Sequence, residues 1–233
     1  MNAAGVLRRL RSLSDPRIVE GMARFGITSA KAFGISAPAI RALAKEIGRD
    51  QKLSLKLWES GYLEARAIAF LIGDPAAVTE EQMERWVRDF DSWGVCDGCC
   101  GSLFDKTPFA FSKALEWSRR GEEFMKRAGF VMMATLAVHD KKAGDREFVR
   151  FLREIVRGSR DERNFVKKGV NWALRQIGKR NRNLNRLAIQ KAEEIRKLQS
   201  RSARWIASDA LRELKSTAVQ RRLDARQRKM GES

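Results

Sequence analysis

An indole and a carboxylate stand four residues apart in the segment 91–104, which reads DSWGVCDGCCGSLF. If this segment is helical, Trp93 and Asp97 share one face and could act on the same ligand. Its glycines weaken a helix and favour a strained turn or a close approach of the backbone. A core tryptophan beside a capping or surface aspartate would explain the same residues, so the spacing alone does not decide.

A second tryptophan lies among cations in the stretch 161–186, DERNFVKKGVNWALRQIGKRNRNLNR. On a helix of about 3.6 residues per turn, Lys168 and Arg175 share the face of Trp172. Apolar residues from Phe165 to Ile177 form the opposite face, which requires a core. The alternative is an amphipathic helix with a buried Trp and solvated cations.

Arg127 is the third candidate, because it stands early in the apolar stretch 124–142, FMKRAGFVMMATLAVHDKK. An arginine at this place could face a ligand, or its guanidinium could extend from the helix end into solvent. The sequence leaves both possibilities open.

The few cysteines and the single histidine limit the chemistry. Cys96, Cys99 and Cys100 could join His139 in a zinc site, but structural zinc usually draws its ligands as two separated pairs, and small buried thiols explain the same residues. We therefore predict no metal and no cofactor. A Ser-His-Asp arrangement would need His139, and neither a GxSxG elbow nor a phosphate-binding glycine loop occurs. Any chemistry must depend on carboxylates, aromatic rings and cations.

The positive charge gathers in the second half of the chain. The net charge is +18; residues 1–110 hold 15 Lys and Arg against 14 Asp and Glu, and residues 111–233 hold 32 against 15. Such asymmetry favours a nucleic acid as partner, since each neutralised phosphate releases counterions. An anionic membrane surface is less suitable, because the basic helices lack an exposed Trp, Phe and Leu face.

Helix signals dominate the sequence, whereas strand alternation and hairpin turns are nearly absent. Helices are expected to begin at Asp15-Pro16, Ser36 to Pro38, Thr79 with Gln82, and Thr107-Pro108. Apolar residues recur at helical spacing over 18–25, 40–47, 53–58, 65–72, 83–90, 109–117, 124–138, 148–156, 165–177, 187–198 and 203–214. Taken two at a time, the expected helices recur at intervals of roughly 35 to 45 residues, as in HEAT-like repeats. A globular helical bundle would show the same local signals.

We predict one domain over residues 1–215, followed by a basic tail over 216–233 that is frayed or disordered. No run of 18 apolar residues occurs, and the N-terminus lacks the pattern of a signal peptide. A cytoplasmic monomer without membrane contact is expected.

Four segments in the same order resemble the bacterial DNA alkylation repair glycosylases of the AlkD family. They are FGISAPAIR at 33–41, Trp93 with Asp97, KRA at 126–128 and FVKKGVNWALRQIGKRN at 165–181. The resemblance extends from about Gly26 to Lys215. Where family members often carry an acidic residue after the first Trp, this chain has Gly94.

The resemblance implies an all-α, HEAT-like helical-repeat superhelix (an α-α solenoid) with a concave basic face. It also implies an enzyme that removes 3-methyladenine and 7-methylguanine from double-stranded DNA. It assigns the catalytic aspartate to Asp97, the lesion-facing tryptophans to Trp93 and Trp172, and the catalytic-site arginine to Arg127. The cations expected to bind DNA are Lys141, Lys142, Lys168, Arg175, Lys179, Arg180 and Arg182. Two other functions remain open: a non-catalytic HEAT-repeat protein that binds DNA or RNA structures, and a protein-interaction scaffold.

Overall fold

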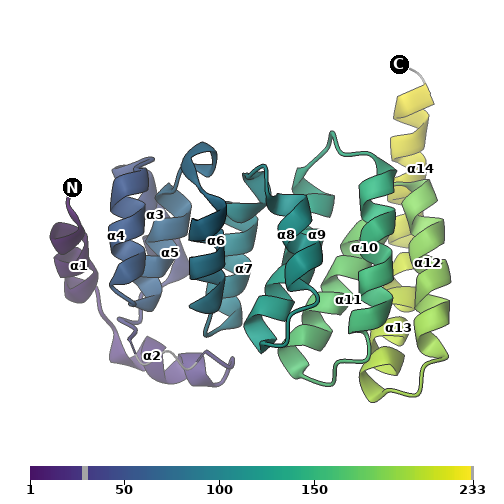
Figure 1. Ribbon diagram of the computed structural model, residues 1–233, viewed down its shortest axis with the longest axis horizontal. Coiled ribbons are helices and arrows are strands. Elements are labelled where there is room, and N and C mark those ends of the chain that lie inside the picture. The colour runs from purple at the N-terminus through teal and green to yellow at the C-terminus, as the bar shows by residue number, and fades with distance from the viewer. Residues whose placement is uncertain (28–30, 232–233) are drawn as a thin grey trace. The chain divides into compact units, whose positions relative to one another are not determined.

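The computed structural model describes residues 1–27 and 31–231 and contains helices throughout these ranges (Figure 1). Within them, fourteen α-helices and two short 3-10 helices are found: α1 (Ala3–Ser12), α2 (Pro16–Ala23), α3 (Ala37–Ile47), α4 (Gln51–Glu59), α5 (Leu63–Ile72), η1 (Pro75–Ala77), α6 (Glu80–Arg88), α7 (Trp93–Ser102), η2 (Phe104–Lys106), α8 (Ala110–Trp117), α9 (Glu123–His139), α10 (Asp145–Gly158), α11 (Asn164–Gly178), α12 (Arg182–Arg196), α13 (Arg201–Leu214) and α14 (Thr217–Gly231). In this described part of the chain, no helix is both long and apolar enough to cross a membrane.

The local start signals act as expected at three of four places. Asp15 caps α2 with Pro16 as its first residue, Ser36 precedes α3, and the Thr79 hydroxyl accepts from the Gln82 amide of α6 at 3.2 Å. The side chains of Asp15 and Thr79 accept from open backbone amides, whereas Ser36 makes no such bond and α3 instead has Pro38, which lacks an amide hydrogen, in its first turn. At the fourth place, Thr107-Pro108, the helix begins slightly later than predicted, because α8 starts at Ala110.

The first compact unit, Met1–Pro108, is organised around α5. This helix packs against α3, α4 and α7. The indoles of Trp58 and Trp86 stack with ring centroids 3.9 Å apart, and both side chains are buried. The stacked rings hold α6, which carries Trp86, against α4. Trp86 also packs against Phe104, which holds the segment after α7.

The second compact unit, which begins at Phe109, has two layers of helices. In one layer α11 lies between α9 and α13, and in the other α10 packs against α8 and α12. Each helix of the second layer also packs against its sequence neighbour in the first: α8 with α9, α10 with α11, and α12 with α13. Successive helix pairs therefore stack side by side within this unit (Figure 1).

The C-terminal segment contains a further helix. Residues 217–231 form α14, with Val219 and Leu223 buried, so the start of the predicted basic tail is packed, and fraying of its end stays a prediction. The helix packs against α12 and α13, and Arg182 of α12 forms an ion pair with Asp224. Two apolar residues four apart give a weak signal in the sequence, but they suffice once neighbouring helices supply a surface.

Candidate functional site

The structure resolves the Trp93 and Asp97 segment as helix α7, which begins at Trp93 itself. The Ser92 hydroxyl accepts from the Val95 amide at 3.5 Å and so caps the helix. Both candidate side chains are partly exposed, and their spacing of four residues puts them on one face. Trp93 is thus not fully buried, and a partly exposed indole and a partly exposed carboxylate share one face of this helix.

The orientation of the Trp93 indole is fixed by a distant part of the chain. Its Nε1–H donates to the backbone carbonyl of Phe25, just after α2, at 2.8 Å. One edge of the ring is therefore tied to this loop, which limits rotation of the indole.

The segment with these glycines is helical rather than a strained turn, and Gly98 is required for packing. A Cβ at Gly98 would lie 2.4 Å from the Phe70 ring of α5, so only glycine permits this contact. At Gly94 a Cβ would meet only Ile27 Cδ1, at 3.5 Å. Gly94 lies within the helix, between Trp93 and Asp97.

The three cysteines lie on the buried side of α7. Burial raises the pKa of the Cys99 and Cys100 thiols well above the ordinary value, which disfavours a thiolate nucleophile. Among the described residues, no group of three His, Cys, Asp or Glu side chains could hold a metal ion. Burial in a tight helix contact accounts for these thiols.

In the second unit, Arg127 occupies a buried position in α9. Its Nη1 donates to the carbonyl of Phe165, at the start of α11, at 2.6 Å. Gly169 of α11 packs against the Arg127 stem, since a Cβ built there would lie 3.5 Å from its Cγ, an ordinary contact distance. The guanidinium therefore links α9 to α11 and does not extend into solvent.

Trp172 lies on α11, three residues after Gly169, and is partly exposed. Lys168, one turn earlier, is exposed. The competing interpretation of a fully buried Trp does not hold, since α11 buries Val170, Ala173 and Leu174 instead. An indole and a cation thus remain accessible on this helix.

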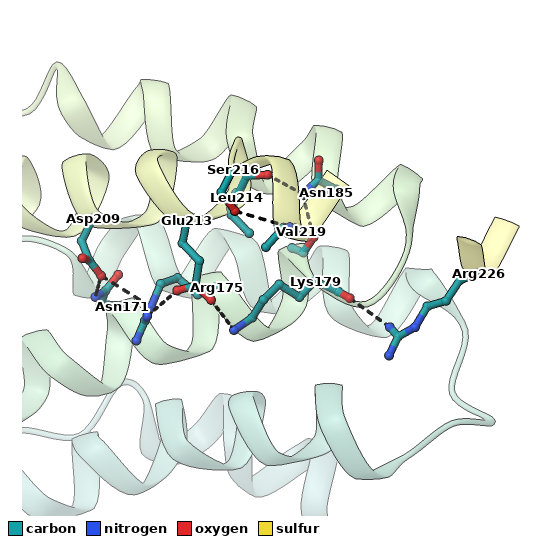
Figure 2. Close-up of polar contacts among 11 residues, drawn as sticks. Asn171, Arg175, Lys179, Asn185, Asp209, Glu213, Leu214, Ser216, Val219 and Arg226 are labelled. Atoms are coloured by element: carbon teal, nitrogen blue, oxygen red, sulfur yellow. Dashed lines mark hydrogen bonds and ion pairs between the residues drawn. The ribbon is translucent and has the colours of Figure 1, made fainter. Parts of the chain in front are cut away.

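Two of the cations predicted to bind DNA are paired with acids of α13. Arg175 binds Glu213 through Nη1, with its Nε 3.6 Å from Asp209 Oδ2, and Lys179 Nζ lies 2.5 Å from Glu213 Oε1 (Figure 2). Asn171 donates to Asp209 at 2.7 Å in the same row. Asp209 and Glu213 are not among the site residues predicted from the sequence, although their spacing of four on a predicted helix places both on one face.

Two more predicted cations have structural partners. Arg180 donates to the carbonyls of Ala137, Asp140 and Ala143 and lies over the Phe148 ring at 4.4 Å. Arg182 binds Gln220 and Asp224 of α14. Lys141 and Lys142 are exposed at the loop after α9, as is Lys168 on α11, so these three lysines are the most accessible of the predicted set.

Comparison with known proteins gives a consistent relationship. A model of the DNA alkylation repair enzyme family matches residues 6–214. No curated protein sequence matches the chain significantly. A solved structure described as "A new family of proteins related to the HEAT-like repeat DNA glycosylases with affinity for branched DNA structures" has a TM-score of 0.75 at 19% identity, over 90% of this chain and 94% of that one.

A designed armadillo repeat protein, YIII(Dq)4CqI, also matches over 76% of this chain and 92% of its own, at 14% identity. Its TM-score of 0.35 is too low to support an argument. The first structure is sufficient to confirm the predicted all-α, HEAT-like repeat fold. Because the family model covers most of its length, the chain belongs to the DNA alkylation repair enzyme family.

Proposed function

We propose that this chain is a DNA glycosylase that hydrolyses the N-glycosidic bond of cationic alkylated purines, such as 3-methyladenine and 7-methylguanine, in double-stranded DNA. Membership of the DNA alkylation repair family supports the general activity. The observation that carries the specific reaction is the pairing of Trp93 and Asp97 on the accessible face of α7.

The chemistry requires few groups. A purine methylated at N3 or N7 is already positively charged, so it can leave without protonation, and the barrier lies in forming an oxocarbenium-like sugar. The carboxylate of Asp97 would stabilise this charge and orient water. The indoles of Trp93 and Trp172 would each attract the cationic nucleotide by about 0.5 to 2 kcal/mol, which a neutral base would not receive.

Arg127 would act through its position. Its Nη1 is held by the Phe165 carbonyl at 2.6 Å, which ties α9 to the helix that carries Trp172. A buried guanidinium so held would add a fixed positive potential near the lesion and keep α11, which carries Trp172, in place.

Phosphate contacts would come first from the exposed lysines Lys141, Lys142 and Lys168. We propose that Arg175, Lys179, Arg180 and Arg182 contribute mainly through the positive potential of the surface, because they are only partly exposed and are engaged by carboxylates or several carbonyls, whereas Lys141 is exposed and donates only to the Val138 carbonyl.

The test is release of free base from methylated duplex DNA in single-turnover assays, with Asp97→Asn as the decisive variant. This change keeps the side-chain volume and removes the anion. We expect folding and DNA affinity close to wild type, and 7-methylguanine excision slower by roughly ten- to a thousandfold, or about 1.4 to 4 kcal/mol. Asp91→Asn removes an exposed carboxylate shortly before α7 and is the matched control. Undiminished excision by a folded Asp97→Asn protein would refute the assignment.

A second candidate function is binding of branched DNA without base excision. It is favoured by the description of the structural relative, whose affinity is for branched DNA structures. If the wild-type chain releases no base from methylated duplex and binds a four-way junction more tightly than a duplex, this second function replaces the first.

A further inference from the structure

A pocket in the second unit lies apart from Trp172 and Arg127, although three of its cations, Lys141, Arg180 and Arg182, belong to the set predicted to bind DNA. Its volume is about 690 Å³, and it is lined by the end of α9 and the loop after it, the first residue of α10, the turn from α11 to α12, and α14. This volume lies within the range that accommodates small molecules, about 300 to 1,000 Å³.

The charge of this pocket favours an anion. Four cationic side chains line it, Lys141, Arg180, Arg182 and Arg226, against the single carboxylate of Asp145. That carboxylate accepts from Asn181 Nδ2 at 2.6 Å and from Asn183 Nδ2 at 2.8 Å. Because both of its oxygens are occupied by amide donors, Asp145 is poorly placed to bind a cation.

The first turn of α12 adds backbone donors to the pocket. The Asn181 side chain caps the helix by accepting from the Leu184 amide at 2.8 Å. The amides of Arg182 and Asn183, at the first two helical positions, have no acceptor within the described part of the chain. Both residues line the pocket, so a helix N-terminus and a cavity meet here.

Arg226 brings a guanidinium to the same place from α14. Its Nη1 donates to the carbonyls of Lys179 and Arg180, each at 3.1 Å, and the contact with Lys179 is visible in Figure 2. Its Nη2 and Nε make no hydrogen bond to any described residue. The guanidinium is thus held in position with donors to spare, as an anion-binding arginine requires.

We propose that this pocket binds the phosphate group of a nucleotide, with Arg226, Lys141 and the α12 N-terminus as its donors. Arg180 and Arg182 are occupied by carbonyls and Asp224, so they add positive potential without direct contact. Ala137, Ala143 and Leu223 supply apolar wall for a sugar or base. The phosphate could belong to a nucleic-acid strand or to a free mononucleotide, and the chemistry of recognition is the same. This proposal shares Lys141 with the proposed phosphate contacts to duplex DNA, but it does not depend on base excision, and Arg226 belongs to this pocket alone.

The experiment uses the full chain with two probes. Deoxyadenosine monophosphate is titrated calorimetrically, and a labelled single-stranded deoxyoligonucleotide is titrated by fluorescence anisotropy. Arg226→Ala and Lys141→Ala should each weaken binding of at least one probe on the order of tenfold. Arg222→Ala on α14 and Arg146→Ala on α10 remove the same charge from exposed positions outside the pocket and should change affinity less than about twofold.

The two probes separate the sources of the phosphate. Sensitivity in the mononucleotide titration supports a free nucleotide, and sensitivity with the oligonucleotide alone supports a strand. Equal losses in all four variants would mean that only bulk charge matters and would overturn the proposal, as would the failure of both probes to bind.

Two further variants serve as controls, one for the charge of Arg226 and one for base excision. Arg226→Lys keeps the positive charge, so it should bind the probes more tightly than Arg226→Ala if that charge contacts the phosphate. If Arg226→Ala weakens binding only by loosening α14, Arg226→Lys should bind as weakly as Arg226→Ala. Asp97→Asn should bind the probes of this pocket like wild type, so that loss of base excision and loss of nucleotide binding are told apart.

Discussion

Glu64 provides a sharp test of how the chain positions Trp93. Its buried carboxylate accepts from three successive backbone amides of the α2–α3 connection: Phe33 at 2.9 Å, Gly34 at 2.7 Å and Ile35 at 3.3 Å. Gly34 has φ of 77°, and a Cβ there would lie 2.2 Å from the Asp15 carbonyl oxygen. The carboxylate therefore holds a loop that only glycine allows to fold this closely.

This loop in turn holds α2. The Asp15 amide donates to the Phe33 carbonyl at 2.9 Å, and α2 leads to the Phe25 carbonyl that binds the Trp93 indole. A substitution at Glu64 should consequently disturb the hydrogen bond of the Trp93 indole, although Glu64 makes no hydrogen bond to Trp93.

Glu64→Gln is the perturbation. The amide oxygen can replace Oε1 and keep the bonds from Gly34 and Ile35, but the NH₂ group then faces the Phe33 amide, donor against donor. One hydrogen bond to a charged group is lost, worth about 1.5 to 3 kcal/mol, and two others become neutral and weaker. Gln is less costly to bury than a carboxylate, which offsets part of this loss. We expect a net destabilisation of about 2 kcal/mol.

Urea unfolding measures this change, and the indole N–H resonance of Trp93, assigned with Trp93→Phe, reports its hydrogen bond. Glu59→Gln removes an exposed carboxylate at the end of α4 and serves as control. If the free energy of unfolding of Glu64→Gln lies within about 0.5 kcal/mol of the wild-type value and the Trp93 resonance is unshifted, the loop is not held by this carboxylate.

Three other predictions concern the second unit. Burial would raise the pKa of Asp161, but hydrogen bonds from Arg163 and Lys126 outweigh it and hold that pKa well below its ordinary value. Asp161→Asn should thus destabilise the protein at neutral pH by about 1 to 3 kcal/mol, and urea unfolding at several pH values should show the difference fading as the pH falls below about 3.9. Gly129→Ala should cost about 2 kcal/mol or more in thermal unfolding, because its Cβ would lie 2.2 Å from the Ser118 amide nitrogen. Trp172→Ala should reduce excision of 7-methylguanine about 2- to 30-fold more than it reduces binding of undamaged duplex.

Each of these has a control and a contrary result. A pH-independent difference for Asp161→Asn would show that the ion pairs do not supply the stability. Gly121→Ala meets no atom within 4 Å and should be tolerated, so equal effects at Gly121 and Gly129 would discount the steric argument. Equal losses of excision and binding in Trp172→Ala, or a loss of helicity, would assign Trp172 to packing.

The sequence by itself determined the helical fold and most helix positions. Caps such as Asp15 and Thr79, and apolar residues at helical spacing, act within a few residues, so they can be read without knowing the fold. The same holds for Trp93 and Asp97 on one helical face. The predicted concave basic face and the single domain over 1–215 stay predictions.

Tertiary structure decided which polar groups are available. Trp93 meets a carbonyl 68 positions away, Arg127 one 38 positions away, and Arg175 and Lys179 meet Glu213. Helix α14 likewise needs α12 and α13 beside it before Val219 and Leu223 can be buried. Charge counts and periodicity carry no record of such pairings, because side chains distant in sequence are brought together only by the packing of helices.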